Sequence, residues 1–136
     1  MKQVIVMRTD LNMRKGKMVA QGSHASMAAL LRDLEQHMYE DGMRMSFYTG
    51  IKGSPEQRAV YDWLNGRFTK ICVGCSSEDE LNEIYEKVLA SGIENHALII
   101  DDGATEFNGV ATRTCLAVGP ALPEEVDKIT GHLKLL

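Results

Sequence analysis

Two adjacent carboxylates, Asp101 and Asp102, directly follow a strand expected at residues 96–100, of which the last four residues are apolar. Gly103 comes next, and Thr105 and Thr112 place hydroxyl groups shortly after it. Polar groups at the end of a strand are a common design for active sites in α/β proteins, and a carboxylate beside hydroxyls suits the orientation of water or of a carbonyl group. The same residue types also form ordinary turns. The motif by itself therefore leaves a catalytic carboxylate and a structural turn equally open.

A second polar segment, Arg14-Lys15-Gly16-Lys17, lies where an expected strand passes into an expected helix. Its glycine permits close approach of the backbone, and the N-terminus of the following helix favours an anion. The spacing does not match a Walker A loop, so a nucleotide site of that kind is not predicted. Spacing alone favours a solvated basic turn, and phosphate binding is the functional alternative.

A third group, Gln21, Ser23 and His24, lies within the same expected helix. A histidine there suits acid/base work near neutral pH. Ser23 and His24 are neighbours in sequence and do not face each other on a helix, which argues against a serine-esterase dyad. A packed or capped structural histidine is the more common reading.

The three cysteines do not indicate a metal centre or a closed disulfide framework. Cys72 and Cys75 have the spacing of a C-x-x-C motif, but they lie in a strand-like run, where residues three apart point to opposite faces. We expect buried structural thiols, no metal and no cofactor.

Around these groups, hydrophobic periodicity and turn residues predict strands alternating with helices. A long helix with a face of small residues is expected over residues 15–39, and a polar loop over 41–54. Capping signals at Ser54-Pro55 and at Ser77 begin two further helices, the second ending at Gly92. Strands are expected at residues 3–8, 70–74, 96–100 and 112–118, and a short last helix from Pro123.

The resulting order, β-α-α-β-α-β-β-α, predicts an α/β fold: one domain over residues 1–136, with a mixed four-stranded sheet and helices on both faces. The last two strands are expected to pair antiparallel. A hydrophobic content of 44% suits one compact core, and no apolar run is long enough to span a membrane. The opening MKQVIVMRTD is charged too early for a secretory signal, so a cytoplasmic location is expected.

The net charge of −4 argues against a simple nucleic-acid-binding protein, but the charge is unevenly distributed. Five basic residues face a single acidic residue, Asp10, among the first seventeen, whereas acidic residues cluster at 78–86. Local fields guide a polyanion to a surface, so a basic mouth on an acidic body remains compatible with RNA.

Taken together, four segments resemble the archaeal/eukaryotic-type (type 2) peptidyl-tRNA hydrolases. Residues 4–26 resemble the opening signature of that family, and IIDDGATEF at 99–107 resembles its strand-end aspartate motif. TCLAVGP at 114–120 and ITGHLKLL at 129–136 resemble its closing segments. The segments occur in the family's order, and residues 40–69 show no recognisable match.

The resemblance implies a four-stranded mixed sheet and cleavage, without a metal, of the ester that joins a peptide to tRNA. Carried over by position, the catalytic lysine and aspartate of the family fall on Lys17 and Asp101, and its threonines on Thr105 and Thr112. The substrate-binding positions are assigned to Arg14, Lys15, Gln21 and His24. Peptidyl-tRNA is the expected partner, and a homodimer is kept open beside a monomer.

Two residues depart from the family pattern. Ala104 stands where a lysine is usual, and Asp102 where a small residue is usual; the loop after Phe107 is one residue longer. We expect a less basic mouth, weaker attraction for tRNA, and a tendency of Asp102 to raise the pKa of Asp101. Two other functions stay open: a non-catalytic RNA- or protein-binding module, and a hydrolase of another small ester.

Overall fold

A mixed five-stranded sheet forms the centre of this protein, whose computed structural model describes residues 1–32, 34–47 and 55–136. The strand order is β5 (His96–Asp101), β6 (Thr112–Ala121), β1 (Lys2–Arg8), β4 (Thr69–Cys75) and β7 (Lys134–Leu135). Strand β1 pairs parallel with β4, whereas β5–β6, β6–β1 and β4–β7 are antiparallel. The mixed sheet and the antiparallel pairing of β5 with β6 are confirmed.

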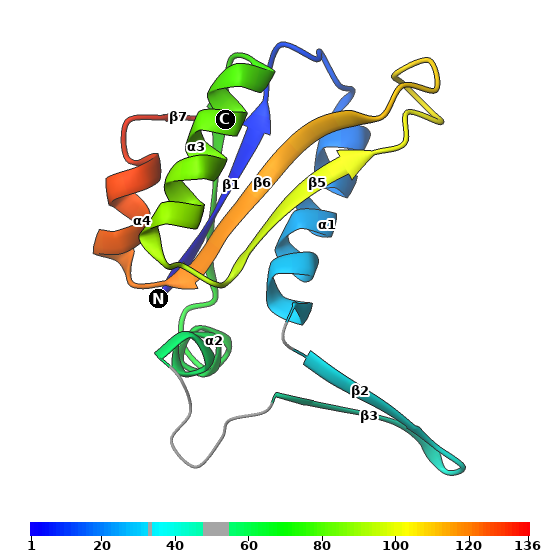
Figure 1. The fold of residues 1–136 in the computed structure, drawn as a ribbon, viewed down its shortest axis with the longest axis vertical. Helices are drawn as coiled ribbons and strands as arrows, with labels where there is room; N and C mark the ends of the chain where they lie inside the picture. The colour runs from blue at the N-terminus through cyan, green and yellow to red at the C-terminus, as the bar shows by residue number, and fades with distance from the viewer. Residues whose placement is uncertain (33, 48–54) are drawn as a thin grey trace.

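Helices cover both faces of this sheet (Figure 1). Helix α1 (Lys15–Leu31) packs its small residues Ala25 and Ala29 on the face that carries Ile5 and Met7. Helices α3 (Glu78–Ser91) and α4 (Pro123–Thr130) cover the opposite face, which carries Val4. Alternate side chains of β1 therefore enter the two cores, as the twofold periodicity of a strand requires.

Local signals account for several helix ends. Ser77 accepts a hydrogen bond from the Glu80 backbone N–H at 3.1 Å, and Gly92 ends α3 in the left-handed conformation. Both features follow the sequence-based prediction. Helix α2 (Pro55–Leu64) begins at the predicted proline, whereas the predicted cap, Ser54, lies outside the described residues.

The predicted helix over residues 15–39 is too long. Helix α1 ends at Leu31, and the rest of the predicted helix contains strand β2 (Leu34–Tyr39). Strand β2 pairs antiparallel with β3 (Gly42–Phe47), which lies within the predicted loop. Helical periodicity of small residues stops at α1, and the Asp41-Gly42 dipeptide is a hairpin signal. Figure 1 shows this hairpin extending away from the main sheet. Residues 48–54 of the predicted loop lie outside the described part.

The predicted number of strands, four, is also wrong for the main sheet. Strand β7 adds a fifth, with Leu135 opposite Val73 and Lys134 opposite Gly74. Two residues are too few to produce a periodic pattern in the sequence. This strand is recognised only by its backbone pairing with the edge of β4. Across the described residues, no helix is both long and apolar enough to cross a membrane.

Candidate active site

The first turn of α1 lies beside the end of β5, and the two segments meet through a close ion pair. Lys17 Nζ lies 2.6 Å from Asp101 Oδ2, and the two side chains are only 13% and 11% exposed. Helix α1 packs against both β5 and β6, which holds the two segments together although 84 residues separate them in sequence. The structure thus brings together the lysine and the aspartate that the sequence singled out separately.

The Asp101 carboxylate accepts three hydrogen bonds. Oδ2 accepts from Lys17 and, at 2.8 Å, from Gln21 Nε2, while Oδ1 accepts from the Gly103 N–H at 2.9 Å. These donors, the Lys17 hydrogen bond foremost, lower the pKa of Asp101 against the opposing effect of burial. Asp101 is therefore a firmly ionised carboxylate.

The expectation that Asp102 raises the pKa of Asp101 is wrong. The pKa of Asp101 is lowered, and Asp102 is not among the groups that shift it. Asp102 is exposed, and its Oδ1 accepts the Ala104 N–H at 3.0 Å. Solvent weakens the repulsion between the two carboxylates, whereas Lys17 contacts Asp101 directly.

Lys17 also contacts the loop that follows β5. Its Nζ donates to Thr105 Oγ1 at 3.0 Å and lies 5.5 Å from the centre of the Phe107 ring. An ammonium group has three N–H donors. Asp101 and Thr105 take two of them, and the hydrogen bonds described for this part of the chain give no acceptor for the third.

Gln21 is held in place by a residue that sequence reasoning missed. Thr114 is fully buried on β6, and its hydroxyl donates to Gln21 Oε1 at 2.5 Å. The Gln21 amide nitrogen is thereby directed at Asp101. Thr112 and Thr114 lie two apart on one strand and so share a face, and this alternation was the available signal.

The loop over residues 102–111 positions Thr105, and its shape depends on Gly103. Gly103 has φ +79°, and a Cβ atom there would lie 2.5 Å from the Val110 carbonyl oxygen. The two ends of this loop also lie close together, because the Gly109 N–H donates to the Gly103 carbonyl at 3.0 Å. Glycine is required for both the conformation and the close approach.

Thr112, the fourth predicted catalytic residue, lies opposite Asp101 in the β5–β6 register. Its hydroxyl donates to the Val110 carbonyl at 2.8 Å and makes no hydrogen bond to Lys17 or Asp101 among the described contacts. Thr112 therefore closes the base of the 102–111 loop in this structure, and a direct catalytic contact stays a prediction.

The predicted substrate-binding residues surround the pair unevenly. Arg14 is largely exposed, and its Nε is bonded to Glu106 Oε1 at 2.7 Å; Lys15 is exposed at the start of α1. Exposed His24 lines, with Gln21 and Asp101, a hollow of about 670 Å³ between α1 and β5. The mouth is thus less basic than the cluster of Arg14, Lys15 and Lys17 suggests, because Glu106 offsets one cation.

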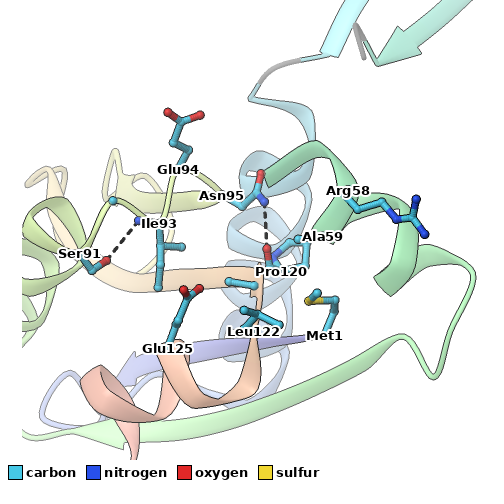
Figure 2. A pocket seen from close by; sticks show the side chains of 12 residues that line it. Met1, Arg58, Ala59, Ser91, Ile93, Glu94, Asn95, Pro120, Leu122 and Glu125 are labelled. Carbon is cyan, nitrogen blue, oxygen red and sulfur yellow. Dashed lines mark hydrogen bonds between the residues drawn. The ribbon is translucent and has the colours of Figure 1, made fainter. Parts of the chain in front are cut away.

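A separate cavity of about 520 Å³ lies at the opposite end of β6, where Figure 2 shows Arg58, Glu94 and Glu125 around it. Buried Asn95 donates there to the Pro120 carbonyl at 2.9 Å. Ser91 also lines this cavity, but its hydroxyl donates to the Val88 carbonyl at 2.7 Å, so the ion pair at the end of β5 is the better candidate for chemistry.

Known proteins are similar to this sequence over nearly its whole length. The family model described as peptidyl-tRNA hydrolase PTH2 matches residues 1–136, including the segment 40–69 in which no motif was recognised. A peptidyl-tRNA hydrolase of Methanocaldococcus jannaschii is 42% identical over 136 residues, with all of both chains covered, and one of Methanothermobacter thermautotrophicus is 41% identical with the same coverage. A probable peptidyl-tRNA hydrolase 2 of Dictyostelium discoideum is 35% identical over 98% of this chain and 54% of its own length. This chain therefore belongs to the PTH2 family of peptidyl-tRNA hydrolases.

Proposed function

We propose that this protein hydrolyses the ester bond between the peptide and the terminal ribose of peptidyl-tRNA, with Lys17, Asp101 and Thr105 at the reacting centre. The observation that carries the proposal is the Lys17–Asp101 contact of 2.6 Å, made at a strand end by a member of this family. Ester hydrolysis needs an oriented water, a cation or donor for the developing oxyanion, and a proton for the leaving oxygen.

Lys17 is assigned to the oxyanion. Its two contacts with Asp101 and Thr105 fix the direction of the remaining N–H, which then donates to the ester carbonyl oxygen as negative charge develops there. A donor held in place before the reaction needs no reorganisation when the charge appears. This role uses the cationic ammonium form of Lys17.

Asp101 is assigned to the attacking water. Water oxygen attacks the ester carbon, and one of its protons passes to the Asp101 carboxylate. The bond from carbon to the ribose oxygen then breaks, and that oxygen takes a proton from the Thr105 hydroxyl, which the proton held by Asp101 replaces; the peptide acid gives up its own proton to water. The products are free tRNA and a peptide carboxylate. Because its pKa is lowered, Asp101 is a weak base, so positioning of the water and of Lys17 is its larger contribution.

Thr105 links these groups to the leaving oxygen. Its hydroxyl accepts from Lys17, so its own proton is available for donation. Gln21 is a positioning residue that acts through Asp101, and Thr112 through the 102–111 loop. Arg14, Lys15 and His24 are proposed to contact tRNA, with phosphates as the main target of the two cations.

The working form of the enzyme belongs to the same proposal. We place it in the cytoplasm, where its substrate is produced, and treat a homodimer as the alternative to a monomer. Light scattering after size exclusion, at the concentration used for kinetics, distinguishes the two states.

Incubation with N-acetyl-aminoacyl-tRNA tests the activity, with release of free tRNA as the readout. Wild-type protein is expected to release tRNA catalytically, and Lys17→Met to do so about a hundredfold more slowly, because one oxyanion donor is lost. A short p-nitrophenyl ester serves as the control substrate. Equal turnover of that ester would favour a general esterase, and binding of peptidyl-tRNA without release would favour a non-catalytic module.

A further inference from the structure

Strand β5 forms an open edge of the main sheet. It pairs with β6 on one side, and within the described residues no strand pairs with its other side. The hydrogen bond from Gly119 N–H to the Asn95 carbonyl sets the phase of the antiparallel ladder. Since backbone groups alternate in direction along such a ladder, those of Ala97 point to β6 and those of Leu98 point to the open side.

The surface beside this edge is continuous with the proposed active site. The hollow lined by Asp101 and Gln21 extends along β5, and a second hollow of about 550 Å³ shares Ala28, Leu98 and Ile100 with it. Ile100, next to Asp101, is 58% exposed. An exposed apolar edge strand can pair with other chains and cause aggregation, and proteins usually block such edges. An edge left open beside the proposed active site therefore suggests that a chain segment binds to it.

We propose that the peptide portion of the substrate occupies this edge as an added strand, parallel to β5. This inference rests on the proposed function. The scissile ester is at the C-terminus of the peptide and must lie at Asp101, the C-terminal end of β5. The rest of the peptide then runs back toward His96, so peptide and strand share one direction.

Pairing of this kind fits a substrate whose side chains vary. Main-chain hydrogen bonds supply affinity without reading the side chains, as in other cases of strand addition. Leu98 lies three residues before Asp101, about 10 Å along the strand. Its N–H and C=O are therefore placed to meet a peptide residue some three positions from the ester, and a single aminoacyl group does not reach them.

The decisive experiment uses wild-type enzyme and a series of substrates. kcat/KM is measured for N-acetyl-aminoacyl-tRNA, for N-acetyl-tetrapeptidyl-tRNA with the same C-terminal residue, and for tetrapeptides N-methylated at one internal amide at a time. The tetrapeptide is expected to gain about tenfold, since one or two hydrogen bonds are added. Methylation of alternate amides should remove three- to tenfold of that gain, and methylation of the amides between them should not.

Variants with matched controls add a second test. Ile100→Glu places a charge on the proposed peptide path, whereas Met27→Glu places the same charge on an exposed site of α1 that lines neither hollow. Ile100→Glu is expected to reduce the tetrapeptide advantage at least threefold, and Met27→Glu to retain it.

The outcomes separate this inference from the proposed function. Release of tRNA from every substrate at equal rates would overturn the strand-addition model alone. The same holds if the tetrapeptide is cleaved faster than the aminoacyl substrate but methylation of each successive amide reduces this gain equally. No release from any substrate would overturn both. If Ile100→Glu converts a dimer to a monomer in light scattering while the length advantage persists, the edge pairs with a second copy and the peptide does not bind there.

Discussion

Removal of one partner from the Lys17–Asp101 pair changes both stability and catalysis, and the double variant separates the two effects. The perturbations are Lys17→Met, Asp101→Asn and their combination, all close in volume to the wild-type side chains. Each single change leaves a charge without its partner in a site where both side chains are less than one-seventh exposed. The combination removes both charges together.

The magnitude follows from the position of the pair. Loss of one partner from a deeply buried pair costs about 3–5 kcal/mol, whereas exposed pairs contribute about 0–1 kcal/mol. This pair lies at a surface mouth and is screened by water, so each single variant is expected to lose about 1–2 kcal/mol. The double variant is expected to recover about half of the combined loss or more, because no lone charge remains.

The pH of the measurement decides whether this effect is visible. The pKa of Asp101 is lowered on folding, so the stabilisation is fully present above the unfolded carboxyl pKa of about 4. It is lost as pH falls through the lower folded value. Urea denaturation at pH 7 therefore reports the whole contribution.

Catalysis should respond differently from stability. Lys17→Met is expected to lower kcat about a hundredfold and Asp101→Asn at least tenfold, with the double variant no slower than Lys17→Met, because groups acting as one unit are not additive. Losses in kcat that multiply in the double variant would refute joint action at one reacting centre. Wild-type rates in either single variant would refute the assignment itself.

Four further results are expected. Glu106→Gln should release Arg14 from its 2.7 Å contact and lower KM for peptidyl-tRNA at low salt, with the difference vanishing at high salt in steady-state kinetics. Ala104→Lys adds an exposed cation to the same loop and should lower KM in the same salt-dependent way while kcat changes less; no salt-dependent gain would show that residue 104 does not face the phosphates. Gly22→Ala should raise the free energy of unfolding by up to about 1 kcal/mol in urea, because an added methyl would lie in ordinary contact, 3.7 Å from Met7 Cε, and alanine is the better helix former. The acid limb of kcat/KM should lie below pH 4, since the pKa of Asp101 is lowered; a limb near pH 6.5 would indicate a histidine base instead.

Local rules account for the elements that the sequence predicted correctly. Helix α3 has its cap at Ser77 and its left-handed end at Gly92, both written in a few adjacent residues. Strand β1 was recognisable because four residues in a row, Val4 to Met7, are apolar and enter the cores on both faces of the sheet. The hairpin β2–β3 was missed because the helical reading of residues 15–39 was extended past its last small residue.

The candidate site divides along the same line. Residue types and spacing marked the segments of this site but left a structural turn open, and the resemblance to a known family singled out Lys17, Asp101 and Thr105. Only the tertiary structure decided that they touch: packing of α1 across β5 and β6 brings Nζ within 2.6 Å of Oδ2. The lowered pKa of Asp101, which reverses the influence expected from Asp102, depends on that distance because direct contacts outweigh screened ones.

Partners remote in sequence were beyond local reasoning altogether. Thr114 directs Gln21 from 93 residues away, and Glu106 neutralises Arg14 from 92 residues away. The open edge of β5 is likewise a property of strand order, which emerges only when β6 pairs with β1 on its other side. The sequence by itself determined which chemical groups are present and which elements carry them. The fold decided which groups meet, because hydrogen bonds and ion pairs act over a few ångströms of space, whatever the separation along the chain.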